Sequence, residues 1–398
     1  MLADMARSSP LGPNPRRVRV VTLIDYMGTH GGAEGLALSV ATRLDPERFE
    51  STLCVSRWPL PGPPSVASAD ALEQLSASGV RLLGLGRRGK VDAWVWARLA
   101  RFLRRERVDV LHAHKFGSNA WGTLLGRATR VPVVLAHEHT WSYQGRPLRR
   151  FLDREVVARG ATRFIAVSRE DRRRMIEIEH IDPRDTLFIP NGVVSLPPPS
   201  GRDVRAELGI PSSAQAIGVV GGLRPQKAHH VLLRAVALLV ERWPGLHALI
   251  IGDGPERAGL ERLTAELALH DTVHFLGSRT DVPDLLSALD IAVCCSDFEG
   301  SPLAVMEYMD ASLPVVASAV GGLPDLIEPG VHGLLVPPND PPALAAALAE
   351  LLDDPQRARA MGARGRERRR AEFDIDVLVR RLEDLYLELL AEHAGKQV

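Results

Sequence analysis

The chain has 398 residues, of which 45% are hydrophobic and 25% charged, the balance of a globular protein with room for two domains. No stretch approaches the run of about 18 apolar residues that a transmembrane helix requires, so none is predicted. The three cysteines show neither a disulfide framework nor a metal-ligand spacing, which predicts a protein of the reducing cytoplasm.

The formal net charge is +0, but it is unevenly distributed along the chain. Residues 1–190 contain 30 Lys and Arg against 20 Asp and Glu, a net charge of +10, and residues 191–398 contain 19 against 29, a net charge of −10. Such asymmetry indicates either an anionic partner of the N-terminal half or attraction between two oppositely charged domains. The sequence leaves both readings open.

The N-terminal half alternates short apolar segments with longer helical ones. Residues 1–17 are polar and proline-rich and are predicted to form a disordered leader, because they lack the apolar segment of a signal peptide. Strands are then predicted at residues 18–24, 51–56, 80–85, 108–114, 131–139 and 162–168. Strand–helix alternation predicts a parallel sheet covered by helices on both faces, so residues 18–190 are assigned to a Rossmann-like domain.

The segment IPNGVVSLPPPSG at residues 189–201 interrupts this pattern and is interpreted as a linker. The alternation then resumes, with strands predicted at residues 216–223, 247–254, 272–278, 290–296, 313–318 and 333–338. Residues 191–373 are therefore assigned to a second Rossmann-like domain, and 374–398 to a C-terminal helix that packs back on the first. The predicted fold class is α/β, with two doubly wound domains facing across a cleft.

Ligands of such sheets bind beyond the carboxyl ends of the strands. After the first strand, Gly31 and Gly32 precede a predicted helix, which suits a phosphate or simply a tight turn. The fingerprint GxGxxG is absent there, which argues against a nicotinamide dehydrogenase. His112 and His114 lie on one side of a predicted strand, where they could bind a sugar hydroxyl, ligate a metal or pack in the core. No third metal ligand stands nearby in sequence, and His137, at the end of the next strand, is equally ambiguous.

The second domain carries charged residues and glycines at corresponding places. Arg224 and Lys227 follow its first strand and suit a diphosphate, although a solvated loop explains them as well. Gly252 and Gly254 form a sharp turn that lets a planar group approach, or serves only as a turn. These signals are weak when taken one at a time.

The segment EGSPLAVMEYM, residues 299–309, has a more specific pattern. Glu299 lies in a loop, and Glu307 lies eight residues later, about two turns of helix away. The N-terminus of that helix favours an anion, and a carboxylate within the helix can accept hydrogen bonds from ribose hydroxyls. The spacing therefore indicates a sugar-nucleotide site, or alternatively a capped helix with a solvated glutamate.

Taken together and in order, these motifs resemble retaining glycosyltransferases of the GT-B fold, in the large family four that includes mannosyl- and N-acetylglucosaminyl-transferases. The motifs are GGAE, HAH, IPNGV, GGLRPQKAHHVLLRA, GDGPE, VHFLG, EGSPLAVMEYM, SLPVVASAVGGLPDLI and GVHGLLVPPND. The resemblance extends over roughly residues 19–373.

The resemblance implies specific roles for residues at matching positions. Glu307 is expected to bind the donor ribose, Glu299 the transferred sugar and Lys227 the diphosphate, and His114 is expected near the reacting end of the sugar. His114, Glu299 and Lys227 are the expected catalytic residues. The expected donor-binding residues are Gly31, Gly32, Arg224, Lys227, Gly252, Gly254, Glu299, Gly300, Ser301, Pro302, Leu303 and Glu307.

The chain departs from the family pattern at two places in the second domain. Gly222 stands where the family usually has an arginine, and Arg224 could supply the missing charge. Tyr308 and Asp310 stand where the family has alanines. Whether these two side chains influence the donor or only the packing is open at this stage.

The resulting expectation is transfer of a hexose from a UDP- or GDP-sugar to an acceptor hydroxyl with retained anomeric configuration, without a metal or another cofactor. A sugar-nucleotide epimerase and a non-catalytic sugar-nucleotide-binding protein are the alternatives. The acceptor is not identified, and a lipid-linked or anionic one fits the arginine-rich residues 98–107 and 146–154. These segments suit the anionic inner face of a membrane or are merely solvated. No nucleic-acid partner is expected.

Overall fold

The computed structural model describes residues 16–28, 32–59, 66–89, 92–139 and 147–396. The chain divides into two compact units, described separately below. The first comprises Met1–His137, Leu152–Phe164 and Val379–Val398, and the second comprises Glu138–Phe151 and Ile165–Leu378. The predictions for Gly31 and for most of the leader lie outside the described residues.

A seven-stranded sheet is formed by the N-terminal half in the order β3-β2-β1-β4-β5-β6-β7. The strands are β1 (Val18–Ile24), β2 (Phe49–Val55), β3 (Arg81–Gly84), β4 (Val110–His114), β5 (Val133–Glu138), β6 (Arg163–Ala166) and β7 (Thr186–Phe188). β1 pairs in parallel with both β2 and β4, so the strand order reverses between β1 and β4. The three-residue strand β7 was not predicted, because it is too short to show a period.

Helices cover this sheet on both faces. They are α1 (Gly32–Arg43), α2 (Val66–Ser78), α3 (Ala93–Arg105), α4 (Phe116–Thr129), α5 (Pro147–Leu152), the π-helical η1 (Asp153–Ala158) and α6 (Arg169–Glu177). Leu23 and Ile24 are consecutive residues of β1, yet Leu23 packs in a cluster with Trp96 and Ile24 in a cluster with Leu38. Successive side chains of a strand point to opposite faces, so both faces of the sheet are buried.

The second sheet has six strands in the order β10-β9-β8-β11-β12-β13. They are β8 (Gln215–Val220), β9 (Leu246–Ile251), β10 (Val273–Gly277), β11 (Ile291–Cys294), β12 (Val315–Ser318) and β13 (Gly333–Val336). Every pairing between neighbours is parallel. The strand order reverses between β8 and β11, and a crevice beyond the strand ends at such a point is where ligands of doubly wound sheets bind.

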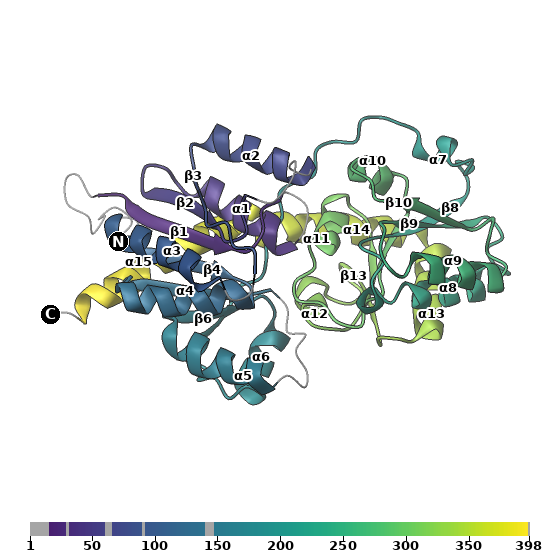
Figure 1. The fold of residues 1–398 in the computed structure, drawn as a ribbon. Helices are drawn as coiled ribbons and strands as arrows, with labels where there is room; N and C mark the ends of the chain where they lie inside the picture. Colours follow the sequence, from purple (N-terminus) through teal and green to yellow (C-terminus); the bar gives the residue numbers. More distant parts are fainter. Residues whose placement is uncertain (1–15, 29–31, 60–65, 90–91, 140–146, 397–398) are drawn as a thin grey trace, which may run out of the picture. The chain divides into compact units, whose positions relative to one another are not determined.

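Helices also cover both faces of this sheet, as Figure 1 shows in teal to yellow. They are α7 (Val204–Glu207), the 3-10 turn η2 (Pro225–Lys227), α8 (His229–Leu239), α9 (Arg257–Glu266), α10 (Val282–Ser287), α11 (Leu303–Asp310), α12 (Leu323–Leu326), α13 (Pro341–Asp353) and α14 (Pro355–Glu372). Val316 packs with residues of α8 and α13, and its neighbour Val315 packs with residues of α10 and α11. The predicted class, two Rossmann-like α/β sheets, is confirmed.

The C-terminal helix α15 (Ile375–Gly395) belongs to the first unit from Val379 onward. Its Glu383 accepts a hydrogen bond from the backbone N–H of Asp45 at 2.7 Å, and its Tyr386 is buried against His112. Although α15 has 21 residues, no helix in the described part of the chain is both long and apolar enough to cross a membrane.

Candidate functional site

Lys227 and Glu299 meet where the strand order of the second sheet reverses. Lys227 ends the turn that follows β8, and Glu299 lies in the loop that follows β11. The Lys227 Nζ donates to Glu299 Oε1 at 2.6 Å. A backbone hydrogen bond of 2.9 Å from Asp297 N–H to the Gln226 carbonyl joins the same two loops. Burial lowers the pKa of Lys227, but the charge and the hydrogen bond of Glu299, together with Cys294 and Cys295, raise that pKa above its usual value.

The carboxylate of Glu299 is held in place from several directions. Ser296 Oγ also donates to Oε1, at 2.7 Å, so two donors converge on one oxygen. Among the described residues, no hydrogen bond reaches Oε2, which leaves that oxygen available to a ligand hydroxyl. A Cβ at Gly321, where φ is +53°, would lie 1.7 Å from the Glu299 carbonyl oxygen, so only glycine lets this neighbouring loop approach so closely.

Glu307 lies on α11, eight residues after Glu299, and its side chain is half-buried. Burial, reinforced by the nearby charge of Asp310, raises the pKa of Glu307. No hydrogen bond to its carboxylate is found in the part of the chain that the structure describes. A half-buried carboxylate with no hydrogen bond from the described residues is well suited to accept hydrogen bonds from a bound ligand.

The start of α11 is fixed by a residue of the predicted linker. Asn191 N–H donates to Ser301 Oγ at 3.3 Å, and Asn191 Nδ2 donates to the Ser301 carbonyl at 3.0 Å. Ser301 and Pro302 are buried and Leu303 is half-buried, and the Gly300 carbonyl accepts from Gly322 N–H at 2.8 Å. The linker motif therefore positions the segment that is predicted to bind the donor, a role that sequence reasoning had not assigned to Asn191.

Gly252 and Gly254 face their own protein rather than open space. A Cβ at Gly252 would lie 2.0 Å from the Gly221 carbonyl oxygen, and one at Gly254 would lie 2.4 Å from that of Leu223. Leu223 N–H donates to the Asp253 carbonyl at 2.9 Å. The sharp turn after β9 thus supports the loop after β8, the loop that leads to Lys227.

Arg224 occupies space beside Gly222. Its Nε lies 3.7 Å from the position that a Cβ would take at Gly222, and its side chain is exposed. Arg224 therefore lies on the same loop as position 222, where the family usually has an arginine. In the first unit, Gly32 is the first residue of α1 and is exposed.

Tyr308 and Asp310, which stand where the family has alanines, have distinct packing roles. Tyr308 is 1% exposed, and its Oη accepts from Val220 N–H at 2.6 Å. Asp310 is also buried and accepts from Leu196 N–H at 2.7 Å. The sequence left both residues unexplained, and the structure buries both in the second unit.

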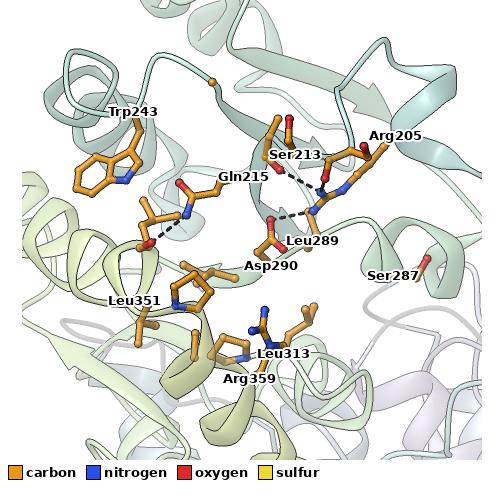
Figure 2. Close-up of a pocket in the computed structure, with 18 of the residues that line it drawn as sticks. Arg205, Ser213, Gln215, Trp243, Ser287, Leu289, Asp290, Leu313, Leu351 and Arg359 are labelled. Atoms are coloured by element: carbon orange, nitrogen blue, oxygen red, sulfur yellow. Dashed lines mark hydrogen bonds and ion pairs between the residues drawn. The ribbon is translucent and has the colours of Figure 1, made fainter.

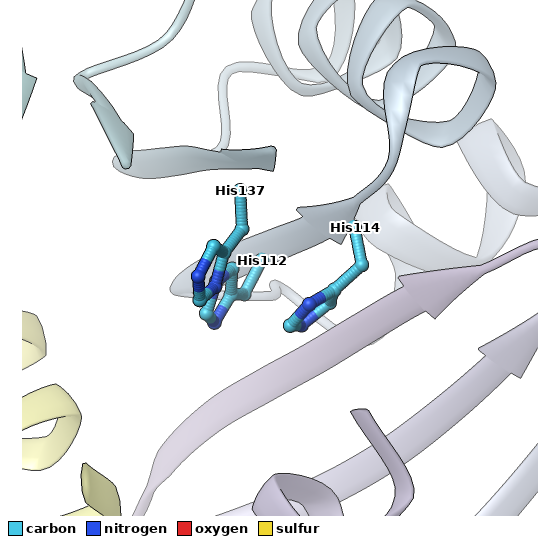
Figure 3. A group of neighbouring side chains, drawn as sticks. All are labelled: His112, His114 and His137. Atoms are coloured by element: carbon cyan, nitrogen blue, oxygen red, sulfur yellow. The ribbon is translucent and has the colours of Figure 1, made fainter. Parts of the chain in front are cut away.

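Three histidines of the first unit come together at the carboxyl end of the sheet (Figure 3). His112 and His114 lie on β4, and the register of the parallel pair β4–β5 places His137 opposite His114. All three are fully buried. His112 Nδ1 lies 2.7 Å from Tyr386 Oη, and His112 Nε2 lies 3.2 Å from His137 Nδ1. Burial lowers the pKa of His137 to about 3 and that of His112 well below its usual value, so both are neutral at pH 7.

The three histidines could together hold a metal ion, because a ring nitrogen of each lies within 4.8 Å of a ring nitrogen of the other two. This limit includes the separation of about 3.4 Å between the ligand atoms of a tetrahedral zinc site. The rings of His112 and His114 stack face to face, with centroids 4.3 Å apart and planes 29° apart. The expectation that transfer needs no metal stays a prediction.

A pocket of about 800 Å³ opens elsewhere in the second unit (Figure 2). It is lined by Gln215 at the start of β8, by Asp290 just before β11 and by Leu313 just before β12. It therefore lies at the amino ends of these strands, at the opposite edge from Lys227 and Glu299. Its Arg205 is already engaged by Asp290 at 2.8 Å. The loops with Lys227 and Glu299, rather than this cavity, carry the predicted chemistry.

Two family models match the chain, and the boundary between them falls within the predicted linker at residues 189–201. The model for "Glycosyltransferase Family 4" matches residues 30–194, and the model for "Glycosyl transferases group 1" matches residues 201–368. The D-inositol 3-phosphate glycosyltransferase of Salinispora tropica is 31% identical, across 96% of this chain and 87% of that protein. The enzyme of that name from Thermobispora bispora is 33% identical, across 71% of each chain.

Solved structures share the fold at lower sequence identity. Anabaena HepE in complex with UDP-glucose superposes with a TM-score of 0.79 at 21% identity, across 94% of this chain and all of that one. The sucrose-phosphate synthase of Thermosynechococcus elongatus superposes with a TM-score of 0.77 at 22% identity, again across 94% of this chain and all of that one. The order of motifs, the two sheets and these relatives agree, and the chain belongs to the group 1 glycosyltransferases.

Proposed function

We propose that this glycosyltransferase moves a hexose from a nucleotide-diphosphate sugar to an acceptor hydroxyl with retention of anomeric configuration. The observation that carries the proposal is the 2.6 Å contact between Lys227 and Glu299. It joins the loops after β8 and β11, where a doubly wound sheet binds its ligand. A cation held there suits the donor's diphosphate, and a carboxylate held there suits the hydroxyls of its sugar.

Five of the expected site residues have a specific role in this proposal. Glu307 accepts hydrogen bonds from the ribose hydroxyls, and Glu299 accepts from hydroxyls of the sugar through Oε2. Lys227 and Arg224 stabilise the negative charge of the diphosphate. In the first unit, His114 contacts the sugar.

The proposed reaction forms a bond between the acceptor oxygen and the anomeric carbon and breaks the bond from that carbon to the diphosphate. The acceptor's proton passes to an oxygen of the leaving phosphate on the same face of the sugar. The protein contributes mainly orientation and stabilisation of the developing negative charge. Because Lys227 and Arg224 supply positive charge, we propose that no metal ion is needed.

The donor and acceptor are proposed from the relatives and from the charge distribution. HepE binds UDP-glucose, which makes a UDP-sugar the first donor to test, with a GDP-sugar beside it. The relatives act on D-inositol 3-phosphate, a phosphorylated polyol. The net charge of +10 over residues 1–190 favours such an anionic acceptor. The family models and relatives favour a transferase over the epimerase and the non-catalytic binding protein.

The decisive experiment offers UDP- and GDP-hexoses with and without D-inositol 3-phosphate, in buffer with and without EDTA. The expected result is an acceptor-dependent glycoside whose proton NMR coupling shows the donor's anomeric configuration. Inversion would refute the retaining mechanism, and loss of turnover in EDTA would refute metal independence. Conversion of the donor alone would support the epimerase, and tight nucleotide binding without turnover over a broad panel of acceptors would support the binding protein.

Contact with an anionic membrane is a separate part of the proposal. The arginines at positions 98, 101, 104 and 105 of α3 are exposed, as is Trp94, which is 73% exposed. Binding to vesicles with anionic lipids at low salt, and release at moderate salt, is the expected signature. No binding at low salt would remove this part and leave the transferase proposal unaffected.

A further inference from the structure

Tyr308 makes an unusual contact with the end of β8. It follows Glu307 on α11 and is one of the largest fully buried side chains in the described structure. Its Oη accepts from Val220 N–H at 2.6 Å and donates to the Val220 carbonyl at 3.2 Å. One hydroxyl thus satisfies both polar backbone groups of the last residue of β8.

The sheet explains why Val220 needs this partner. β8 pairs with β9 over its whole length, as far as Val220 opposite Ile251. It pairs with β11 only at Ile217 and Gly218, so the two strands separate toward their carboxyl ends. Gly221 N–H points to β9 and donates to Ile251, so the polar groups of Val220 point to the β11 side. A partly buried peptide without a partner is costly, and the Tyr308 hydroxyl replaces the missing strand.

We propose that Tyr308 is a positioning residue for the donor site. Its hydroxyl joins α11, which carries Glu307, to the strand end that leads through Gly222 and Arg224 to Lys227. The inference rests on the proposed function, because it assigns the two linked elements to the donor's ribose and diphosphate. The alanine expected at this position in the family has no hydroxyl, and the arginine expected at position 222 is also missing. Both departures therefore lie at the same strand end.

The test removes only the hydroxyl. Tyr308→Phe keeps the ring in its cluster and leaves the Val220 peptide without its partner. The expected result is a roughly tenfold higher Kd for UDP or GDP, measured by calorimetry, since a tenfold change corresponds to about the net worth of one buried hydrogen bond. Turnover at saturating donor is expected to fall less than affinity, because Tyr308 does not touch the reacting atoms.

Tyr386→Phe is the matched control. Tyr386 is also fully buried, and its Oη is also engaged, at 2.7 Å from His112 Nδ1, but it belongs to the first unit. Both variants are expected to lower Tm, and only Tyr308→Phe is expected to weaken nucleotide binding. If Tyr308→Phe lowers Tm as the control does but binds UDP and GDP like the wild type, Tyr308 is merely structural and the inference is wrong.

Hydrogen exchange separates this inference from the proposed function. Amides of residues 220–227 are expected to exchange faster in Tyr308→Phe than in the wild type without any ligand, because the strand end loses its anchor. Unchanged exchange there would overturn the inference, whether or not the wild type binds a nucleotide. Wild-type protein that binds neither UDP nor GDP, with faster exchange in the variant, would instead refute the proposed function while the anchoring role stands.

Discussion

Lys227 and Glu299 are 72 residues apart in the chain, yet Lys227 Nζ lies 2.6 Å from Glu299 Oε1. The pair is poorly exposed, with 25% of the Lys227 side chain and 8% of the Glu299 side chain accessible. In the proposed function a bound diphosphate would share Lys227 with Glu299, so the pair would orient the cation before the donor arrives. This arrangement matches electrostatic catalysis, in which charges are held where negative charge develops.

Replacing Lys227 by methionine should mainly affect catalysis. Loss of one preorganised charge donor is expected to lower kcat/KM by about 10²–10³-fold, assayed with a UDP-hexose and D-inositol 3-phosphate. Arg242→Met is the control, because Arg242 pairs with Asp353 on the exposed surface of the same unit. Equal kcat/KM for Lys227→Met and the control would contradict the assignment of Lys227 to the diphosphate.

Glu307→Gln should weaken donor binding and remove the pH dependence of the donor KM that the wild type is expected to show. Loss of charged hydrogen bonds to two ribose hydroxyls is expected to raise the donor KM by roughly 10–100-fold. Because burial raises the pKa of Glu307, the wild-type carboxylate takes up a proton at a higher pH than an ordinary glutamate. The wild-type KM should therefore rise as pH falls, and in Glu307→Gln this rise should be absent. An unchanged donor KM in Glu307→Gln would remove Glu307 from the site.

Arg369 should be a major contributor to the stability of the second unit. It is fully buried, and its guanidinium donates to the Val193 carbonyl at 2.6 Å, to Asp374 at 2.8 Å and to Ser195 Oγ at 2.9 Å. Asp310 lies 3.5 Å from the same group. The guanidinium therefore ties the linker to the segment that precedes α15.

Arg369→Met is expected to lower the free energy of unfolding by about 3–5 kcal/mol, because it leaves the buried carboxylate of Asp310 and the half-buried carboxylate of Asp374 without their cation. Urea denaturation measures this loss. Arg357→Met is the comparison, since Arg357 pairs with Glu350 at the surface, and its cost should stay within about 1 kcal/mol. Similar losses for the two variants would show that the buried network contributes no more than a surface pair.

Acid should destabilise the fold through buried histidines. Burial lowers the pKa of His137 to about 3 and that of His229 to about 4, whereas a histidine of the unfolded chain titrates near 6.5. Between these values only the unfolded chain binds the proton, so stability is full above about pH 6.5 and falls as pH decreases toward 4. At pH 5 each group is expected to cost about 2 kcal/mol relative to pH 7.

The measurement is urea unfolding of wild-type protein, His137→Gln and His229→Gln at pH 5 and pH 7. Each variant should lose less stability between the two pH values than the wild type does. His270→Gln, which replaces an exposed histidine, should behave like the wild type. A wild-type free energy of unfolding that does not change between pH 7 and pH 5 would contradict the buried, neutral state of these histidines.

The positions of the donor loops follow from local patterns in the sequence. The apolar segments at residues 216–223 and 290–296 predicted strands, and the structure has β8 and β11 there. Lys227 and Glu299 were therefore expected at strand ends from their immediate neighbours in the chain. The motif order and its resemblance to a known family identified the class of enzyme, and the family comparisons confirm it. The roles of individual site residues remain predictions.

The partners of these residues could not be predicted in the same way. His137 was considered apart from His112 and His114, and only the register of β4 with β5 brings the three together. Tyr308 was an unexplained departure until its hydroxyl was found on Val220, 88 residues away. Asn191 was recognised only as part of a linker motif, although it holds Ser301.

The difference has a physical cause. Helices and strands depend on side-chain periodicity and on turn residues within a few positions, which any reader of the sequence can inspect. Contacts such as Lys227 with Glu299 depend on strand order and register, which are set by the packing of both sheet faces at once. The alternation of elements, the strand ends and the family were thus accessible before the fold was known. The convergence of donors on Glu299, the stacked histidines and the anchoring of β8 by Tyr308 required the folded chain.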